Sequence, residues 1–267
     1  IIHTHHRYMD LLGYAINKLT GIPVVSSVHS MVEGKKILSY KNKPVIAVSN
    51  AVKNHLIEKF SLKAEEVAVL TNPINPNEFS FDTNVFKIRS NKVIAYIGRI
   101  STEKGIEILL RAFEKILQTI PEAELHIAGE GDKTEYLRGY IAAGNRGIVY
   151  HGPVMNPGEI YKTTDMVVLP SLVDSFPYGM LEAGCFGKMF IGSDIGGMQE
   201  YITDGFNGML FPAGDSDALA EKVCKALVES DLRVLMGSRL HKKVLEENSL
   251  PQYLEKLTAI YFRLTAK

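Results

Sequence analysis

Short apolar segments alternate with amphipathic helical patterns along most of this chain, and this order restricts the fold more than any other feature. Several segments are continuously apolar, which is typical of strands buried on both faces of a parallel sheet. The predicted strands are Val24–Val28, Val45–Val48, Val67–Leu70, Val93–Ile97, Glu124–Ala128, Ile148–Tyr150, Met166–Leu169 and Met189–Gly192. The repeated order of strand and helix predicts an α/β fold with helices on both faces of a parallel sheet.

Amphipathic patterns predict the helices between these strands. The clearest runs from residue 105 to residue 120, where apolar residues recur at the i, i+3, i+4 and i+7 positions of one face. Residues 8–19 and 51–60 predict two further helices, and either Asp215 or Ser216 can cap another.

The segment Thr71–Ser90 interrupts this alternation with turn-forming residues, and we place a domain boundary near its end. The predicted organisation is a partial N-terminal domain over 1–83, a more complete α/β domain over 84–248 and a last amphipathic segment over 249–267. The first residues, Ile1-Ile2-His3, read like the middle of a buried strand. We therefore expect the first domain to be part of a larger one.

Charge and cysteine content exclude some classes of function. Lys and Arg together number 30, as do Asp and Glu, so the chain lacks the basic excess of a general nucleic-acid-binding protein. Cys185 and Cys224 lie beside apolar residues in helical patterns and are predicted to be buried thiols in a reducing compartment. No Cys/His cluster has zinc-site spacing, and no apolar run approaches the ~18 residues that span a bilayer.

Two cations follow the predicted strand Val93–Ile97. Gly98 makes a tight turn, and Arg99 and Lys104 stand five residues apart, just before the predicted helix. Ligands of open parallel sheets bind beyond the carboxyl ends of the strands, where helix N-termini favour anions. A planar guanidinium and a mobile ammonium in this place suit a diphosphate. The alternative is that both cations are solvated at the surface.

Two carboxylates follow the predicted strand Met166–Leu169. Asp174 falls in a loop and Glu182 about one turn into the next helix, so both can face one crevice and accept hydrogen bonds from sugar or ribose hydroxyls. Between them, residues 175–179 can present backbone N–H groups to phosphate or sugar oxygens. The alternative is that Asp174 or Ser175 caps the helix and Glu182 is solvated.

Two glycine-rich segments complete the pattern. Gly129-Glu130-Gly131 half-matches a dinucleotide-binding fingerprint, but Thr134 stands where the third glycine belongs, so we predict no nicotinamide site. The segment Gly196-Gly197-Met198-Gln199-Glu200 by itself indicates only loop and turn.

In their order and spacing these segments resemble the retaining glycosyltransferases of family 4, which have the two-domain GT-B architecture with Rossmann-like domains. The matching residues are Gly98-Arg99, Lys104-Gly105, Gly129-Glu130-Gly131, Asp174 through Glu182-Ala183, and Gly196-Gly197 with Glu200. Upstream, the matches are His3-Thr4-His5, Pro23 through His29, Val48-Ser49 and Thr71-Asn72-Pro73. Asp174 replaces the family's usual Glu, so its contacts with the sugar are expected to differ. The family's first strand and its Gly-rich loop have no counterpart in these residues.

The resemblance implies a role for each matching residue. Arg99 and Lys104 would bind the donor diphosphate and stabilise it as it leaves, without a metal. Asp174 would contact hydroxyls of the transferred sugar, and Glu182 would hold the ribose. His29 would lie near the transferred sugar, with a purely structural histidine as the alternative. The family has no agreed protein nucleophile, so we assign none.

Other residues would line the donor site by the same resemblance. The backbone near Pro153 and Val154 would meet the nucleotide base. The remaining predicted donor-binding residues are Gly98, Gly129, Glu130, Ser175, Phe176, Pro177, Tyr178 and Gly179. The segment 249–267 resembles the family's terminal helix, which returns to the N-terminal domain and buries its apolar face there.

The resemblance thus implies a hexosyltransferase-type enzyme. It would move a sugar from a nucleotide-diphosphate sugar to a glycan or lipid-linked acceptor with retention of configuration, in polysaccharide biosynthesis in the cytoplasm. Lys35, Lys36, Lys41 and Lys43 leave open a peripheral contact with the inner membrane face, with a solvated loop as the alternative. The alternative function is a non-catalytic nucleotide-sugar-binding or interaction module.

Overall fold

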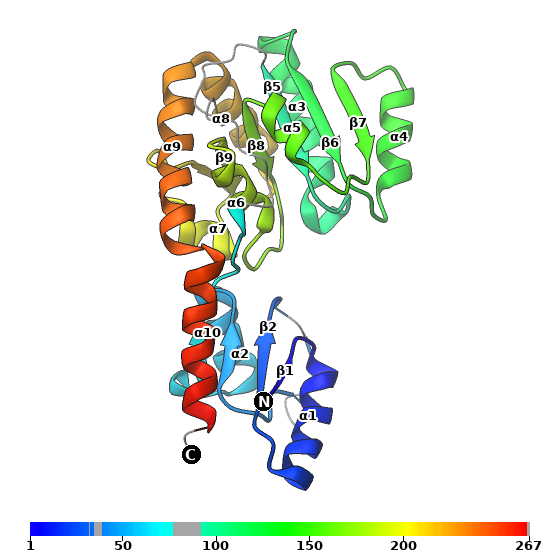
Figure 1. Ribbon diagram of the computed structural model, residues 1–267. Coiled ribbons are helices and arrows are strands. Elements are labelled where there is room, and N and C mark those ends of the chain that lie inside the picture. Colours follow the sequence, from blue (N-terminus) through cyan, green and yellow to red (C-terminus); the bar gives the residue numbers. More distant parts are fainter. Residues whose placement is uncertain (32, 35–38, 77–91, 266–267) are drawn as a thin grey trace. The chain divides into compact units, whose positions relative to one another are not determined.

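The computed structural model describes residues 1–31, 33–34, 39–76 and 92–265 (Figure 1). The chain divides into two compact units, each with its own parallel sheet. The first unit comprises Ile1–Pro73 and Asn248–Lys267, and the second comprises Ile74–Glu247. The predicted boundary between residues 83 and 84 lies outside the described residues.

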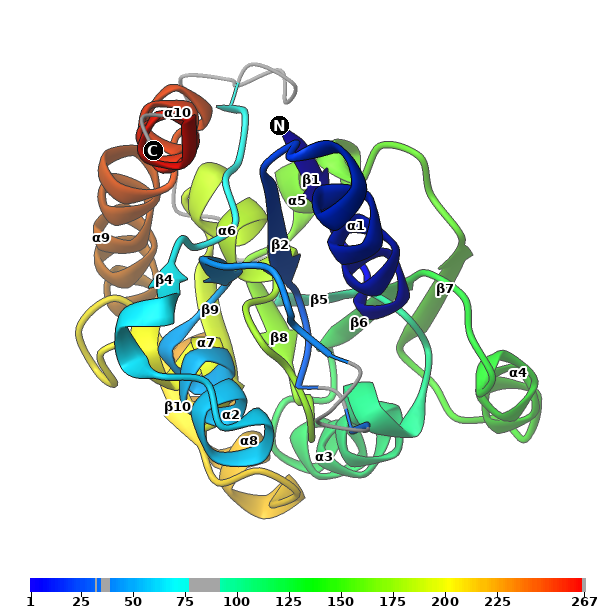
Figure 2. The same cartoon turned by 90° about the horizontal axis from the view of Figure 1, so that it is seen from below.

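The first unit is a four-stranded sheet with helices beside it. All its strands are parallel, in the order β1-β2-β3-β4, and α1 lies along β1 and β2 (Figure 2). The strands are β1 Ile2–Thr4, β2 Val24–Val28, β3 Val45–Ala47 and β4 Val67–Val69. The helices are α1 Arg7–Thr20, α2 Asn50–Phe60, the short 3-10 helix η2 Ala64–Glu66, and α10 Leu250–Thr265.

The C-terminal helix α10 completes the core of the first unit. Its partly buried residues pack against a buried cluster of Val25, Ile46 and Leu70 from three neighbouring segments. These helix residues are Tyr253, Leu257, Ile260, Tyr261 and Leu264. Their i, i+3, i+4 spacing places them on one helix face, so the last segment of the chain folds with the first.

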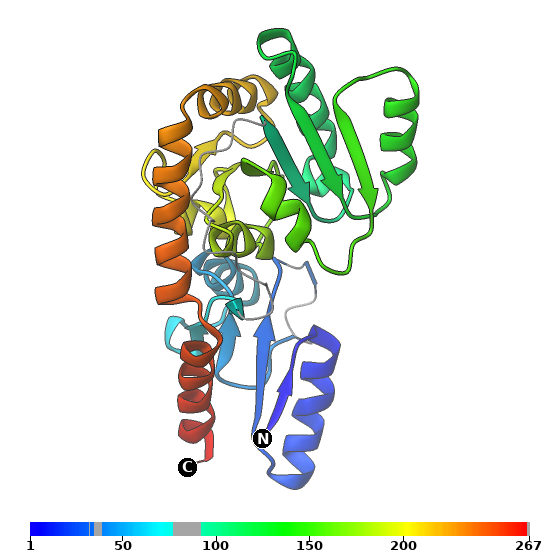
Figure 3. The same ribbon diagram turned by 45° about the horizontal axis from the view of Figure 1, so that its top comes forward.

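The second unit is a six-stranded parallel sheet in the order β10-β9-β8-β5-β6-β7. Its green strands β5, β6 and β7 lie side by side in Figure 3. The strands are β5 Val93–Ile97, β6 Glu124–Ala128, β7 Ile148–Gly152, β8 Met166–Leu169, β9 Met189–Ser193 and β10 Met209–Phe211. The helices are η4 Thr102–Lys104, α3 Ile106–Thr119, α4 Thr134–Ala142, α5 Gly158–Thr163, α6 Tyr178–Cys185, α7 Gly196–Tyr201, α8 Ser216–Val228 and α9 Ser230–Glu247.

The strand order of this sheet reverses direction at β5. The chain moves from β5 outward to β6 and β7, and then returns through α5 to β8, which pairs with the other side of β5. The loops that follow β5 and β8 therefore both lie at this reversal, where the Leu172 N–H donates to the Glu103 carbonyl oxygen over 2.7 Å. In open α/β sheets, ligands bind in the crevice that such a reversal creates at the carboxyl ends of the strands.

The structure confirms the predicted α/β fold with parallel sheets. All eight predicted strands are present, with ends shifted by two residues at most. Asp215 caps α8, because its carboxylate accepts hydrogen bonds from the N–H groups of Asp217 and Ala218. None of the described helices is long and apolar enough to cross a membrane.

One prediction is wrong: residues 196–200 lie in helix α7 rather than only in loop and turn. The two glycines, Gly196 and Gly197, do not indicate a helix in the sequence, because glycine has a low helix propensity. Here they serve close packing. A Cβ on Gly196 would lie 1.9 Å from the Asp174 carbonyl oxygen, and one on Gly197 would lie 2.3 Å from that of Ser175.

Candidate active site

The predicted donor residues of the second unit follow the carboxyl ends of its central strands. Arg99 comes two residues after β5, and Asp174 comes five residues after β8. These are the two strands between which the sheet order reverses. The reversal of strand order therefore lies at the same loops that the sequence singled out, which is where open α/β sheets commonly bind ligands.

Lys104 and Asp174 form an ion pair between these loops. The Lys104 ammonium donates a hydrogen bond to Asp174 Oδ2 over 2.6 Å, and the Ser171 hydroxyl donates to the same oxygen over 3.1 Å. Asp174 is 8% exposed, whereas the Lys104 side chain is 26% exposed. The alternative in which Asp174 or Ser175 caps α6 is wrong, because the capping position is Pro177 and no side chain caps this helix.

Arg99 is the more exposed cation. Its side chain is 59% exposed, and it donates to the Glu103 carboxylate over 3.2 Å. The backbone of Arg99 is held instead by Tyr96, whose hydroxyl donates to the Arg99 carbonyl oxygen over 2.6 Å. A surface ion pair of this kind contributes little stability, so the guanidinium can exchange its carboxylate for a ligand at small cost.

Glycines let these loops approach one another. Gly105 has φ 73°, and a Cβ there would lie 1.8 Å from the Pro170 carbonyl oxygen. Gly129 has φ 132°, and a Cβ there would lie 1.9 Å from the carbonyl oxygen of Gly98. The loop after β5 is fastened to β6 by a hydrogen bond of 3.0 Å from the Gly98 N–H to the Ala128 carbonyl. Glycine is required at both positions by conformation and by space.

Glu182 is a largely buried carboxylate. The Tyr161 hydroxyl donates to Glu182 Oε2 over 2.6 Å. Burial raises the pKa of Glu182, and this hydrogen bond opposes part of the rise. Burial also raises the pKa of Tyr161, and the neighbouring Glu182 charge adds to that effect. The alternative of a solvated Glu182 is therefore wrong. One of its carboxylate oxygens, Oε2, is thus held by Tyr161.

The remaining predicted donor residues divide into buried and accessible ones. Ser175, Phe176 and Pro177 are buried, and Phe176 packs edge-on against Tyr201 at a ring distance of 5.4 Å. Tyr178 is 51% exposed. Three further positions differ in exposure: Gly179 is partly exposed, Pro153 is exposed and Val154 packs against the buried residues Ala95, Ala128 and Ile160. Glu130 accepts a backbone hydrogen bond of 3.0 Å from the Ile100 N–H.

His29 lies in the first unit, in a row of histidines. His29 Nε2 lies 3.0 Å from His5 Nδ1, and the two rings stack. His5 also stacks on His3, at a ring distance of 4.3 Å. His3 is hydrogen-bonded to the hydroxyls of Tyr261 (2.6 Å) and Ser27 (2.8 Å). Burial and the charge of His5 lower the pKa of His29, while a side-chain hydrogen bond with Asn72 opposes this.

These histidines make stability depend on pH. Burial, His5 and His29 together lower the pKa of His3 from 6.5 to about 4. The unfolded chain therefore binds a proton between about pH 6.5 and pH 4 that the folded chain does not bind. We expect stability to be complete above pH 6.5 and to fall towards pH 4, by on the order of 1–2 kcal/mol after allowance for half-exposure.

Urea unfolding followed by circular dichroism at pH 7.5, 6 and 5 measures this slope. His3→Asn should flatten it, whereas replacement of the exposed Lys18 by Gln should leave it unchanged. Equal slopes for the native chain and His3→Asn would contradict the assignment.

Several residues of these sites carry no sequence signal. Tyr161 meets Glu182 from α5, and Ser171 meets Asp174 from within its loop. The Tyr161 contact arises from tertiary packing and the Ser171 contact from the conformation of the loop, so no sequence motif indicates either one. The sequence indicates Tyr96 only as a residue of a buried strand, and not as the donor that holds the Arg99 backbone. Within the described residues, no three or more His, Cys, Asp or Glu side chains are grouped to hold a metal ion.

Comparison with solved structures shows the class of fold. The HepE protein of Anabaena, solved in complex with UDP, matches 98% of this chain and 78% of its own with TM-score 0.89 and 18% identity. A glycosyltransferase from Rickettsia africae matches 98% of this chain and 76% of its own with TM-score 0.84 and 22% identity. Two parallel α/β units with these neighbours define a fold of the GT-B type.

The family follows from the sequence comparisons. Residues 80–243 match the family model described as glycosyl transferases group 1, and residues 1–78 match that described as glycosyltransferase family 4. The chain belongs to the group 1 glycosyltransferases.

Curated relatives are distant in sequence. An uncharacterised glycosyltransferase of Methanocaldococcus jannaschii is 29% identical over 98% of this chain and 74% of its own length. The capsular polysaccharide biosynthesis glycosyltransferase CapM of Staphylococcus aureus is 26% identical over 85% of this chain. A D-inositol 3-phosphate glycosyltransferase of Corynebacterium diphtheriae is 23% identical over 89% of it. The match spans 63% and 64% of the lengths of the last two proteins.

Proposed function

We propose that this protein transfers a sugar from a nucleoside-diphosphate sugar to an acceptor hydroxyl. Family membership supports the class of reaction, and one observation carries the assignment of the site. The Lys104–Asp174 ion pair lies at the reversal of the strand order, between the loops that follow β5 and β8. A cation and a buried carboxylate side by side there suit the two halves of a donor, its diphosphate and its sugar hydroxyls.

The proposed chemistry makes direct use of these groups. The bond between the anomeric carbon and the diphosphate oxygen breaks, and the acceptor oxygen bonds to the same carbon, while the acceptor proton passes to the released diphosphate. Negative charge grows on the leaving diphosphate. The ammonium of Lys104 spends one of its three N–H groups on Asp174, so the others can stabilise that charge together with Arg99. Asp174 keeps Oδ1 for sugar hydroxyls.

The finer features remain proposals of the same kind. We propose a hexosyl donor, retention of configuration and no metal requirement, with a glycan or lipid-linked acceptor in polysaccharide biosynthesis. CapM, whose name includes capsular polysaccharide biosynthesis, supports that context. We also propose a cytoplasmic location, supported by the free thiols Cys185 and Cys224. Of the basic run proposed to contact a membrane, Lys35 and Lys36 lie outside the described residues.

A thermal-shift screen of the protein against nucleoside-diphosphate sugars tests the proposal, because a ligand that binds the folded chain raises its apparent stability. UDP-sugars come first, since HepE was solved with UDP. Positive donors are then incubated with acceptor mixtures, and proton NMR of the product reports the anomeric configuration. Stabilisation with transfer supports the proposal. Stabilisation without transfer or donor hydrolysis favours the nucleotide-sugar-binding module, and no stabilisation by any donor contradicts both.

Glu182 provides a sharper test of the nucleotide half of the site. Glu182→Gln keeps the shape but loses the charge that strengthens hydrogen bonds from ribose hydroxyls. We expect the donor Kd to rise by about 10- to 100-fold. Calorimetric titration with UDP measures this. Tyr161→Phe is the matched control, since it removes the partner of Glu182 while leaving the carboxylate, and should change Kd by less than the Gln variant. An unchanged Kd in Glu182→Gln would rule out the ribose assignment.

A further inference from the structure

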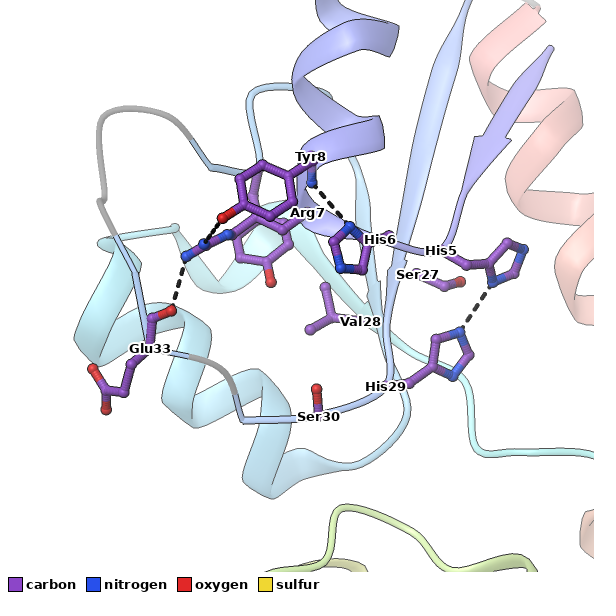
Figure 4. Close-up of a pocket in the computed structure, with 10 residues that line it drawn as sticks. His5, His6, Arg7, Tyr8, Ser27, Val28, His29, Ser30 and Glu33 are labelled. Carbon is purple, nitrogen blue, oxygen red and sulfur yellow. Dashed lines mark hydrogen bonds between the residues drawn. The ribbon is translucent and has the colours of Figure 1, made fainter.

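The first unit holds a cavity of about 180 Å³ between the start of α1 and the end of β2 (Figure 4). Polar and aromatic side chains line it, among them His6, Arg7, Tyr8, Ser30 and Tyr40. Ligand sites commonly combine such aromatic walls with a few placed polar groups. Arg7 contributes a fixed positive charge to the cavity.

Arg7 is held in place without a carboxylate partner. Its Nη1 donates to the Glu33 carbonyl oxygen over 2.8 Å, and its Nη2 donates to the Tyr8 hydroxyl over 3.3 Å. The guanidinium carbon also lies 5.1 Å from the centre of the Tyr8 ring. These contacts use two of the five N–H groups of a guanidinium. In the part of the chain that the structure describes, no carboxylate lies within ion-pair distance of Arg7.

The two nearby acids do not neutralise this charge. Glu33 contacts Arg7 through its backbone, and its carboxylate points away from the guanidinium (Figure 4). Asp10 is fully buried, and its carboxylate accepts hydrogen bonds from Ser26, the Lys41 N–H and Asn42. Among the described residues, neither carboxylate pairs with Arg7, so its positive charge stays available to a ligand.

A second donor comes from His6. This residue caps α1, and its Nδ1 accepts a hydrogen bond from the Tyr8 N–H over 3.4 Å. In the neutral ring the proton must then sit on Nε2, which makes that atom a donor. The hydroxyls of Tyr8 and Ser30 add adaptable donors on the cavity wall. The N-terminal end of α1, which carries the positive end of the helix dipole, also favours an anion at this place.

We propose that this cavity, which we call the Arg7 pocket, binds an anionic group of the sugar acceptor, a phosphate or a carboxylate. The identification of the ligand as the acceptor rests on the proposed function. There the nucleotide-binding residues all lie in the second unit, which leaves the first unit to bind the acceptor. A guanidinium with free N–H groups pairs with the oxygens of either anion in a planar, two-bond arrangement. The pocket then selects charged acceptors over neutral ones.

Gly34 offers a way to move the guanidinium without removing its charge. A Cβ at Gly34 would lie 1.2 Å from Arg7 Nη1. The side chain of Arg7 must therefore shift in Gly34→Ala, while the backbone can stay in place because the obstructed atom is the end of a flexible side chain. Arg7→Gln removes the charge, and Arg7→Lys keeps the charge but loses the planar fork.

Binding of three matched probes tests the proposal: glucose 6-phosphate, glucuronate and glucose, each titrated into the whole chain by NMR. We expect at least one charged probe to bind about 10-fold or more tightly than glucose. The identity of the probe that binds distinguishes phosphate from carboxylate. Arg7→Gln and Gly34→Ala should each weaken that binding about 10-fold, and Arg7→Lys should weaken it less. Lys18→Gln, which removes a cation from the far end of α1, should leave it unchanged.

Equal binding of the three probes would overturn the proposal, as would unchanged binding of the charged probe in Arg7→Gln. Thermal melts show whether each variant is folded, and Gly34→Ala keeps the test decisive if Arg7→Gln is unstable. Nucleoside-diphosphate binding is measured in parallel. If no donor binds while the charged probe still binds through Arg7, the proposed transferase function fails and the anion pocket stands.

Discussion

Replacement of Lys104 by alanine is expected to lower the rate of sugar transfer by about 10²- to 10³-fold, because the variant loses the cation that faces charge growing on the leaving diphosphate. Donor affinity should fall less than turnover, since the charge is greater in the transition state than in the bound donor. Steady-state kinetics with the donor identified by the thermal-shift screen gives both values. Turnover within threefold of the native protein would show that Lys104 does not serve the reaction.

A structural cost must be separated from this chemical one. Lys104→Ala leaves the Asp174 carboxylate, 8% exposed, without its ion-pair partner. We expect a loss of stability of about 1–3 kcal/mol, reduced from the value of a fully buried pair because Lys104 is partly solvated. The double variant Lys104→Ala/Asp174→Asn is the control. It should recover stability because the stranded charge is gone, and it should remain inactive.

Replacement of Gly129 by alanine is expected to destabilise the second unit by at least about 3 kcal/mol. Its φ of 132° is strained for a residue with a side chain, and its new Cβ would lie 1.9 Å from the Gly98 carbonyl oxygen. Neither problem can be relieved by turning a side chain, because both partners are backbone. Urea unfolding followed by circular dichroism measures the loss.

Gly98→Ala is the matched control for this prediction. It adds the same methyl group on the other side of the same contact, where the nearest atoms are 3.8 Å and 3.9 Å away on Tyr96. We expect its stability to stay within about 0.5 kcal/mol of the native value. If the donor lies against Gly98, as proposed, this variant binds it more weakly while remaining fully folded. Similar stabilities for the two variants would contradict the argument from close packing.

The strands and several helices were predictable because their signals are local. An apolar run such as Met166–Leu169 reports its own burial, and the spacing of apolar residues in α3 reports the face that it buries. The helix at Gly196 was not predictable in this way. Its glycines are required because the backbone of Asp174 and Ser175, about twenty residues earlier, packs directly against them. The local sequence does not show that contact.

The candidate site divides along the same line. The position of Arg99 and Lys104 after one strand, and of Asp174 and Glu182 after another, could be read from the sequence, because parallel sheets place their ligands at carboxyl ends. The side chains that each of these residues contacts could not be read from the sequence. Lys104 and Asp174 are 70 residues apart and meet over 2.6 Å, and Tyr161 reaches Glu182 from a separate helix.

The sequence by itself determined the class of fold, the order of the strands along the chain and the residue types of the candidate site, because periodicity and spacing are properties of nearby residues. Only the tertiary structure decided the order of the strands in the sheets, the pairing of Lys104 with Asp174 and the Arg7 pocket. Those features depend on which distant segments pack together, and the free energy of that packing belongs to the folded chain as a whole.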